Sequence, residues 1–220
     1  MIESMIKIWA KYDYVFINGL FGTLWLAVVT VFLGTILGTL IAMLRMSRFK
    51  FFYALTSAYI EVLRGTPSLL QLYFFWLILP KLLPISVSDT ACIVVALIVN
   101  SSAYVAEIIR AGIQAVDKGQ TEAAKSLGLS NANTMRYVIL PQAVKNILPA
   151  LCNEFIIMVK ETSLASVFFV GELMTAYKTV QSTTFLAVPT LTIVGIIYFV
   201  VNFVLSKLLK AFERRLQESD

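Results

Sequence analysis

Histidine is absent from this sequence of 220 residues, and cysteine occurs only twice. Cys92 and Cys152 lie far apart in apolar surroundings, with no spacing that suits a pair of metal ligands. Without histidine, and without a convincing nucleophile beside a base, catalytic chemistry has few groups to use. The sequence therefore argues against a zinc protein and against an enzyme.

Nucleotide-binding motifs are also missing. The phosphate-binding loop pattern G-x-x-x-x-G-K-S/T occurs nowhere in the chain. We therefore expect no cofactor in this chain. If ATP drives its activity, the ATP and Mg²⁺ must be held by an ATPase on another polypeptide.

Charged residues are scarce. They make up 14% of the chain, whereas a soluble domain has about 25%. Hydrophobic residues reach 59%, and the mean hydropathy is +0.82. This composition predicts an integral membrane protein with one membrane domain over residues 1–220. The net charge of +5 is better explained by membrane topology than by a nucleic acid partner.

Long apolar runs predict an all-α polytopic fold. A membrane-spanning helix needs about 20 apolar residues, and five runs reach that length. The expected spans are residues 16–44, 52–79, 91–113, 147–175 and 186–209. Five spans cannot form two equal inverted halves, so a pathway through this protein needs a second copy or a sister chain.

The basic residues predict the orientation, because basic loops stay in the cytoplasm. Eleven lie on one side of the expected spans and four on the other. The N-terminus is then outside, and the C-terminus and the segment 117–141 are inside. The larger group is Arg45, Arg48, Lys50, Lys118, Lys125, Arg136, Lys145, Lys207, Lys210, Arg214 and Arg215; the smaller is Lys7, Lys11, Lys81 and Lys178.

Glycine and proline modify two of the expected spans. Gly34 and Gly38 stand four residues apart in the first span, a spacing that favours close packing of helices. Gly65 and Pro67 interrupt the second span. We expect the helix to break there and to expose backbone groups that can hold a charged ligand.

The polar segment 117–141 predicts two short helices. Asp117, with Gln120 three residues later, has the pattern of a capping box. Gly128 suits the left-handed position after a helix, and Ser130 is a second candidate N-cap. We expect the second helix to stop before Pro141, because proline disfavours helix at the residue before it. On composition alone, the segment could equally be a solvated connector.

This segment closely resembles the cytoplasmic coupling loop of membrane subunits of ATP-binding cassette (ABC) importers. The resemblance rests on Glu122-Ala-Ala-Lys-Ser-Leu-Gly128 and on Ile139-Leu-Pro141. In that family the loop occupies a groove of the ATPase and transmits its movement to the spans. The resemblance implies that Glu122, Ala123, Ala124 and Gly128 contact the ATPase.

Charged groups at membrane depth usually face a cavity or a partner, because burying them costs about 2.5–3.5 kcal/mol each. Lys160 is such a group. It cannot easily pair within its own helix with Glu154 or Glu161. It must pair with another span, for example with Glu61 or Glu107, or line a cavity for a zwitterionic amino acid.

Further motifs resemble the polar amino acid branch of these permeases. They are Arg64-Gly-Thr-Pro67 with Gln71, Asn153-Glu-Phe-Ile156, and Lys160-Glu-Thr-Ser-Leu164. The resemblance covers nearly the whole chain. It implies a pair of permease chains, two ATPases, an extracytoplasmic substrate-binding protein and a small-molecule amino acid. The residues implied to bind the substrate are Pro67, Leu69, Asn100, Glu154 and Lys160.

Roles within this set follow from charge. Lys160 would hold the carboxylate of the amino acid, and Asn100 would hydrogen-bond its head group. Glu154 would read a cationic side chain or serve only the structure. Two other functions stay open: an ion-gradient-coupled carrier that relays charge through the buried Glu and Lys residues, and a structural membrane subunit with no ligand site.

Overall fold

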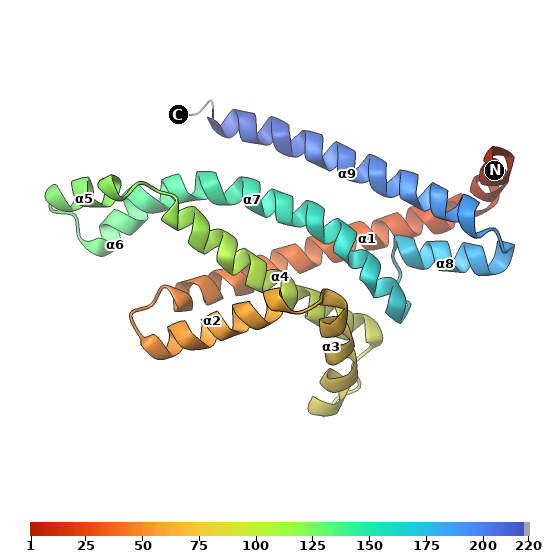
Figure 1. Ribbon diagram of the computed structural model, residues 1–220, viewed down its shortest axis with the longest axis horizontal. Coiled ribbons are helices and arrows are strands. Elements are labelled where there is room, and N and C mark those ends of the chain that lie inside the picture. The colour runs from red at the N-terminus through yellow and green to blue at the C-terminus, as the bar shows by residue number, and fades with distance from the viewer. Residues whose placement is uncertain (218–220) are drawn as a thin grey trace.

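The computed structural model describes residues 1–217, and side chains through residue 215. Within that range the chain is entirely helical, as expected, with no strand (Figure 1). The elements are α1 (Ile2–Arg45), α2 (Lys50–Gly65), α3 (Ser68–Leu82), α4 (Asp89–Gln114), α5 (Lys118–Ser126), α6 (Asn131–Thr134), the π-helical turn η1 (Met135–Ile139), α7 (Leu140–Glu161), the 3-10 helix η2 (Thr162–Phe168), α8 (Leu173–Thr184) and α9 (Ala187–Gln217).

Helices α1 and α4 form the centre of the molecule. Gly34 and Gly38 lie on the contact face of α1, as the sequence predicts. A Cβ at Gly38 would come within 2.8 Å of the Ser102 carbonyl oxygen, and one at Gly34 within 3.0 Å of the Ser101 Cβ. The two glycines therefore permit an approach that a side chain would block.

The expected interruption of the second span is confirmed. Helix α2 ends at Gly65, α3 begins at Ser68, and their axes differ by 111°. Thr66 and Pro67 are extended, because proline restricts the residue before it and cannot donate a backbone hydrogen bond.

Three of the described helices, α1, α4 and α9, are long and apolar enough to cross a membrane. The bent pair α2–α3 raises the number to four if it counts as one span. The expected span 147–175 does not form one continuous helix. Helix α7 ends at Glu161, and η2 and a turn carry the chain to α8.

The two ends of the molecule differ in what they present. Figure 1 shows the N-terminus at one end, and α5, α6 and the C-terminal part of α9 towards the other. The turn between α1 and α2 lies towards the same end as α5 and α6. A membrane placed across the long axis would therefore put the N-terminus opposite the segment 117–141.

The segment 117–141 forms two helices, but the second does not stop before Pro141. Helix α6 continues through η1 into α7, and Pro141 lies in the first turn of α7. The prediction failed because the π-helical turn shifts the backbone pairing just before Pro141, where the Leu140 amide donates to the Met135 carbonyl, and so accommodates the proline within the helix. The loop is therefore joined to α7 by continuous helix.

Candidate functional site

A small polar cavity lies where the break between α2 and α3 meets α4 and α7. Its volume is about 100 Å³. Two of the predicted substrate residues, Asn100 and Glu154, line it together. The full lining is Ser68, Asn100, Tyr104, Glu154, Ile157, Met158 and Glu161.

Gln71 fixes the geometry of the break. Its Nε2 donates to the Leu63 carbonyl at 2.7 Å and to the Thr66 carbonyl at 3.1 Å. Its Oε1 accepts a 2.8 Å hydrogen bond from Asn100 Nδ2. One buried side chain therefore satisfies backbone groups freed by the break and sets the orientation of the Asn100 amide on α4.

Two carboxylates face the cavity from α7. Glu154 is 4% exposed, and its Oε1 accepts from Ser101 Oγ at 3.3 Å. Glu161 lies seven residues further along α7, which is close to two full turns, so both side chains lie on nearly the same face. A basic side chain, Arg64, lies beside this lining, with its guanidinium 5.5 Å from the centre of the Tyr104 ring.

The other predicted substrate residues lie around this cavity rather than in its lining. Pro67 is exposed and precedes α3, and Leu69 is half-buried in the first turn of α3. Lys160 is exposed on α7, and within residues 1–215 it makes no ion pair. Pairing of Lys160 with Glu61 or Glu107 inside the chain is therefore not found.

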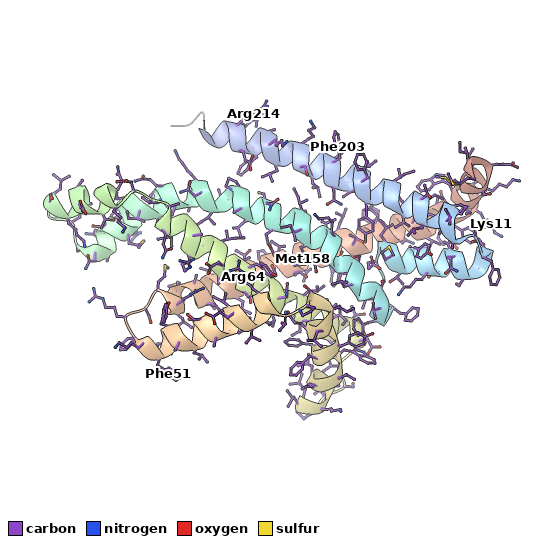
Figure 2. The ribbon with its side chains drawn as sticks, viewed as in Figure 1. Lys11, Phe51, Arg64, Met158, Phe203 and Arg214 are labelled. Carbon is purple, nitrogen blue, oxygen red and sulfur yellow. The ribbon has the colours of Figure 1, made fainter. Side chains whose placement is uncertain are left out.

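Glu107 instead joins three arginines from three helices. Arg45 Nη1 on α1 lies 2.6 Å from Glu107 Oε2, and Arg64 Nη1 on α2 lies 4.0 Å from Oε1. Arg110, one turn along α4, also pairs with Glu107. Arg64 links this cluster to the polar cavity through Tyr104 (Figure 2 labels Arg64 near the centre of the molecule). The sequence gives no signal that these four residues meet.

The residues predicted to contact an ATPase lie on α5 and the turn after it. Asp117 caps α5, since its Oδ1 accepts from the Gly119 amide at 2.7 Å, as predicted. Glu122 and Ala123 are exposed, whereas Ala124 is 4% exposed and faces the chain. Gly128 has φ of +84°, the left-handed conformation that was expected.

Three larger hollows are lined mostly by apolar side chains. One of about 570 Å³ lies beside the α2–α3 bend, lined by Tyr59, Val62, Leu70, Phe74 and their neighbours. A zwitterion would lose its hydration there without gaining charged partners. The polar cavity is therefore the better candidate site.

Comparison with known proteins identifies the family of the chain. Residues 34–218 match the family described as binding-protein-dependent transport system inner membrane component. The arginine transport system permease protein ArtQ of Bacillus subtilis (strain 168) is 41% identical over 204 residues, which cover 93% of each chain. The glutamine transport system permease protein GlnP of Escherichia coli (strain K12) is 36% identical over 202 residues, covering 91% of this chain and 92% of GlnP.

Solved structures give the same result. The crystal structure of an amino acid ABC transporter with histidines superimposes with a TM-score of 0.90 at 48% identity, covering 94% of this chain and 96% of that one. The MetNI methionine ABC transporter, at 17% identity and a TM-score of 0.77, shares the fold. The resemblance noted in the sequence is confirmed, and the chain belongs to the membrane permease subunits of binding-protein-dependent ABC importers.

Proposed function

We propose that this chain forms the translocation pathway of an ATP-driven importer of polar or basic amino acids. The observation that carries the proposal is the polar cavity, in which Asn100, Glu154 and Glu161 meet the start of α3. The arginine permease ArtQ and the glutamine permease GlnP are 41% and 36% identical to the chain over more than nine-tenths of its length. This similarity supports the same substrate class.

The cavity suits a cationic amino acid best. Glu154 and Glu161 provide two carboxylates for a guanidinium or ammonium group, and charge-assisted hydrogen bonds of this kind are strong. The amide of Asn100, which hydrogen-bonds to Gln71, would bind the head group. Glutamine, which lacks the side-chain charge, would use the same polar groups less strongly.

The substrate carboxylate has two candidate partners. The first backbone N–H groups of α3, at Ser68 and Leu69, have no partner within their own helix, and the start of a helix carries partial positive charge. Pro67 directs this start towards the cavity lined by Ser68. Lys160, exposed next to Glu161, is the second candidate and would act from the open face of α7.

ATP hydrolysis would take place on separate subunits that hold ATP and Mg²⁺. Glu122, Ala123 and Gly128 are exposed and available to a groove of an ATPase, whereas Ala124 supports α5 from inside. Movement of α5 can reach the cavity directly, because η1 and α7 follow the loop without a break and α7 carries Glu154. The C-terminus and the loop would face the cytoplasm and the N-terminus the outside.

The assembly would contain two permease chains, identical or sister, two ATPases and an extracytoplasmic substrate-binding protein in a prokaryotic plasma (inner) membrane. An ion-gradient carrier is less well supported, because Glu107 is neutralised by arginines and does not join Glu154 in a relay. A purely structural subunit would have no use for two carboxylates beside a buried amide.

The test is uptake by proteoliposomes that contain this chain, its ATPase and its binding protein. We expect arginine, lysine, histidine or glutamine to accumulate inside the vesicles. This accumulation should require ATP in the vesicle lumen, on the side that the ATPase faces. Uptake that follows an ion gradient without ATP would contradict the proposal, as would an assembly that hydrolyses ATP without responding to any amino acid.

A further inference from the structure

The turn between α1 and α2 combines exposed basic and exposed aromatic residues. Arg48 and Lys50 are exposed on either side of Phe49. Phe49 is 69% exposed and Phe51 is 72% exposed. Figure 2 shows Phe51 at the end of α2 next to the turn. Phenylalanine rings beside Lys and Arg are common in segments that lie at the membrane interface.

The aromatic residues form a small cluster of their own. The Phe52 ring meets Phe49 with ring centres 6.1 Å apart and Phe51 with ring centres 5.7 Å apart, both edge to face. No buried core of the described chain includes these three rings. They therefore form an apolar patch on the surface of the chain, which would be exposed to water unless a membrane or a partner covered it.

A further cationic residue, Arg45, lies four residues before Phe49. The Arg45 side chain, 15% exposed, reaches back from the turn to Glu107, which Arg110 also contacts. Glu107 is the only carboxylate that these two arginines pair with among the described side chains. Glu107 is also shared with Arg64, so the three cationic side chains of the turn, Arg45, Arg48 and Lys50, have only this shared carboxylate as an ion-pair partner among the described side chains.

Donor groups at the turn also lack partners. The Nε of Arg45 and the hydroxyl of Ser47 are buried and have no hydrogen-bond partner among residues 1–215. Native proteins rarely leave buried donors unpaired. Both groups stand within three residues of the exposed Arg48. They therefore favour an acceptor that comes from outside the chain.

We propose that the α1–α2 turn binds an anionic phospholipid of the inner leaflet. The headgroup phosphate would lie among Arg45, Ser47, Arg48 and Lys50, and the acyl chains would cover the rings of Phe49 and Phe51. The phospholipid is preferred to free phosphate because it alone satisfies both the cations and the aromatic patch. The inference rests on the proposed orientation, which places this turn on the same side as α5 and α6.

Native mass spectrometry of the full chain, purified in detergent with equimolar phosphatidylglycerol and phosphatidylcholine, tests the proposal. We expect the wild-type chain to retain phosphatidylglycerol in preference to phosphatidylcholine. The double variant Arg48→Gln/Lys50→Gln should lose that preference by about tenfold or more, since each juxtamembrane basic residue contributes substantially to binding anionic lipid. The matched control is Lys207→Gln/Lys210→Gln, which removes two exposed charges near the end of α9 and should keep the preference.

Two further measurements separate the alternatives. Millimolar inorganic phosphate should leave phosphatidylglycerol bound, and its displacement would overturn the proposal in favour of a free-anion site. Equal loss in both double variants would overturn it in favour of general attraction to a basic surface. If the turn variant instead loses only its affinity for the ATPase and retains lipid as the wild type does, the turn belongs to that interface and the proposal is wrong. Because the readout is lipid retention, its failure leaves the proposed transport function untouched.

Discussion

Asn100 on α4 donates a 2.8 Å hydrogen bond to Gln71 on α3, and so ties the centre of α4 to the break that follows α2. Gln71 uses its own amide on the Leu63 and Thr66 carbonyls. The same bond connects the local backbone geometry of the break to the head-group contact of the candidate substrate cavity. A change at Gln71 should therefore affect both stability and binding.

Replacing Gln71 with alanine should lower the apparent melting temperature of the purified chain and weaken amino acid binding. Each buried group left without its partner costs about 1–3 kcal/mol, and the Asn100 amide and the Leu63 carbonyl would both be affected. Asn146→Ala, an exposed replacement elsewhere on α7, is the matched control and should change neither quantity. A Gln71→Ala variant with wild-type stability and affinity would refute the role given to this side chain.

Replacing Glu154 with glutamine should reduce arginine uptake about tenfold or more, since a charge-assisted hydrogen bond contributes about 1.5–3 kcal/mol. Glutamine uptake should fall much less, because the introduced amide keeps an oxygen that can accept from the Ser101 hydroxyl. Competition between labelled arginine and unlabelled glutamine in proteoliposomes measures the change. Glu61→Gln, which alters an exposed carboxylate on α2, serves as the control. An equal loss for both substrates would mean that Glu154 has a structural role only.

The Glu107 cluster should be needed for folding and coupling. Glu107→Gln leaves Arg45 and Arg110 without their carboxylate in a largely buried site, where breaking an ion pair costs about 3 kcal/mol. We expect a lower melting temperature and reduced transport. The control is Glu3→Gln, whose partner Lys7 is 75% exposed and whose loss should have no measurable effect. Unchanged melting in the Glu107 variant would show that the arginines do not depend on this carboxylate.

Gly128 should tolerate asparagine far better than valine. Its φ of +84° is readily adopted by glycine, sometimes by asparagine, and only with strain by a β-branched residue. ATP hydrolysis and uptake measured together should show uncoupling in Gly128→Val and near-normal coupling in Gly128→Asn. Gly195→Ala, where a Cβ would meet nothing within 4 Å, controls for glycine replacement in general. Equal coupling in all three variants would remove Gly128 from the coupling surface.

Local signals in the sequence predicted the features that depend on local chemistry. Pro67 and Gly65 predicted the break, Asp117 the start of α5, and Gly34 with Gly38 the close contact of α1 with α4. Each of these depends on backbone conformation or on the absence of a side chain, which a few neighbouring residues determine.

Features that depend on three-dimensional pairing were missed. The meeting of Arg45 with Glu107 joins residues 62 positions apart, and hydropathy carries no information about such a contact. The bend of 111° could not be predicted from the sequence either, because Gly65 and Pro67 indicate a break in the helix but not its angle. The continuation of the helix through Pro141 depends on the π-helical turn η1, which proline at this position does not predict.

The most direct test of the account is a crosslink between α5 and the ATPase in the assembled transporter. Ala123 is exposed, so Ala123→Cys is a better probe than Ala124→Cys, whose side chain would face the chain. Ser182→Cys, exposed on α8 towards the opposite end, is the control. The account predicts that Ala123→Cys forms a crosslink with a cysteine in the ATPase groove and that its yield changes with ATP. A crosslink from Ser182→Cys, with none from Ala123→Cys, would contradict it.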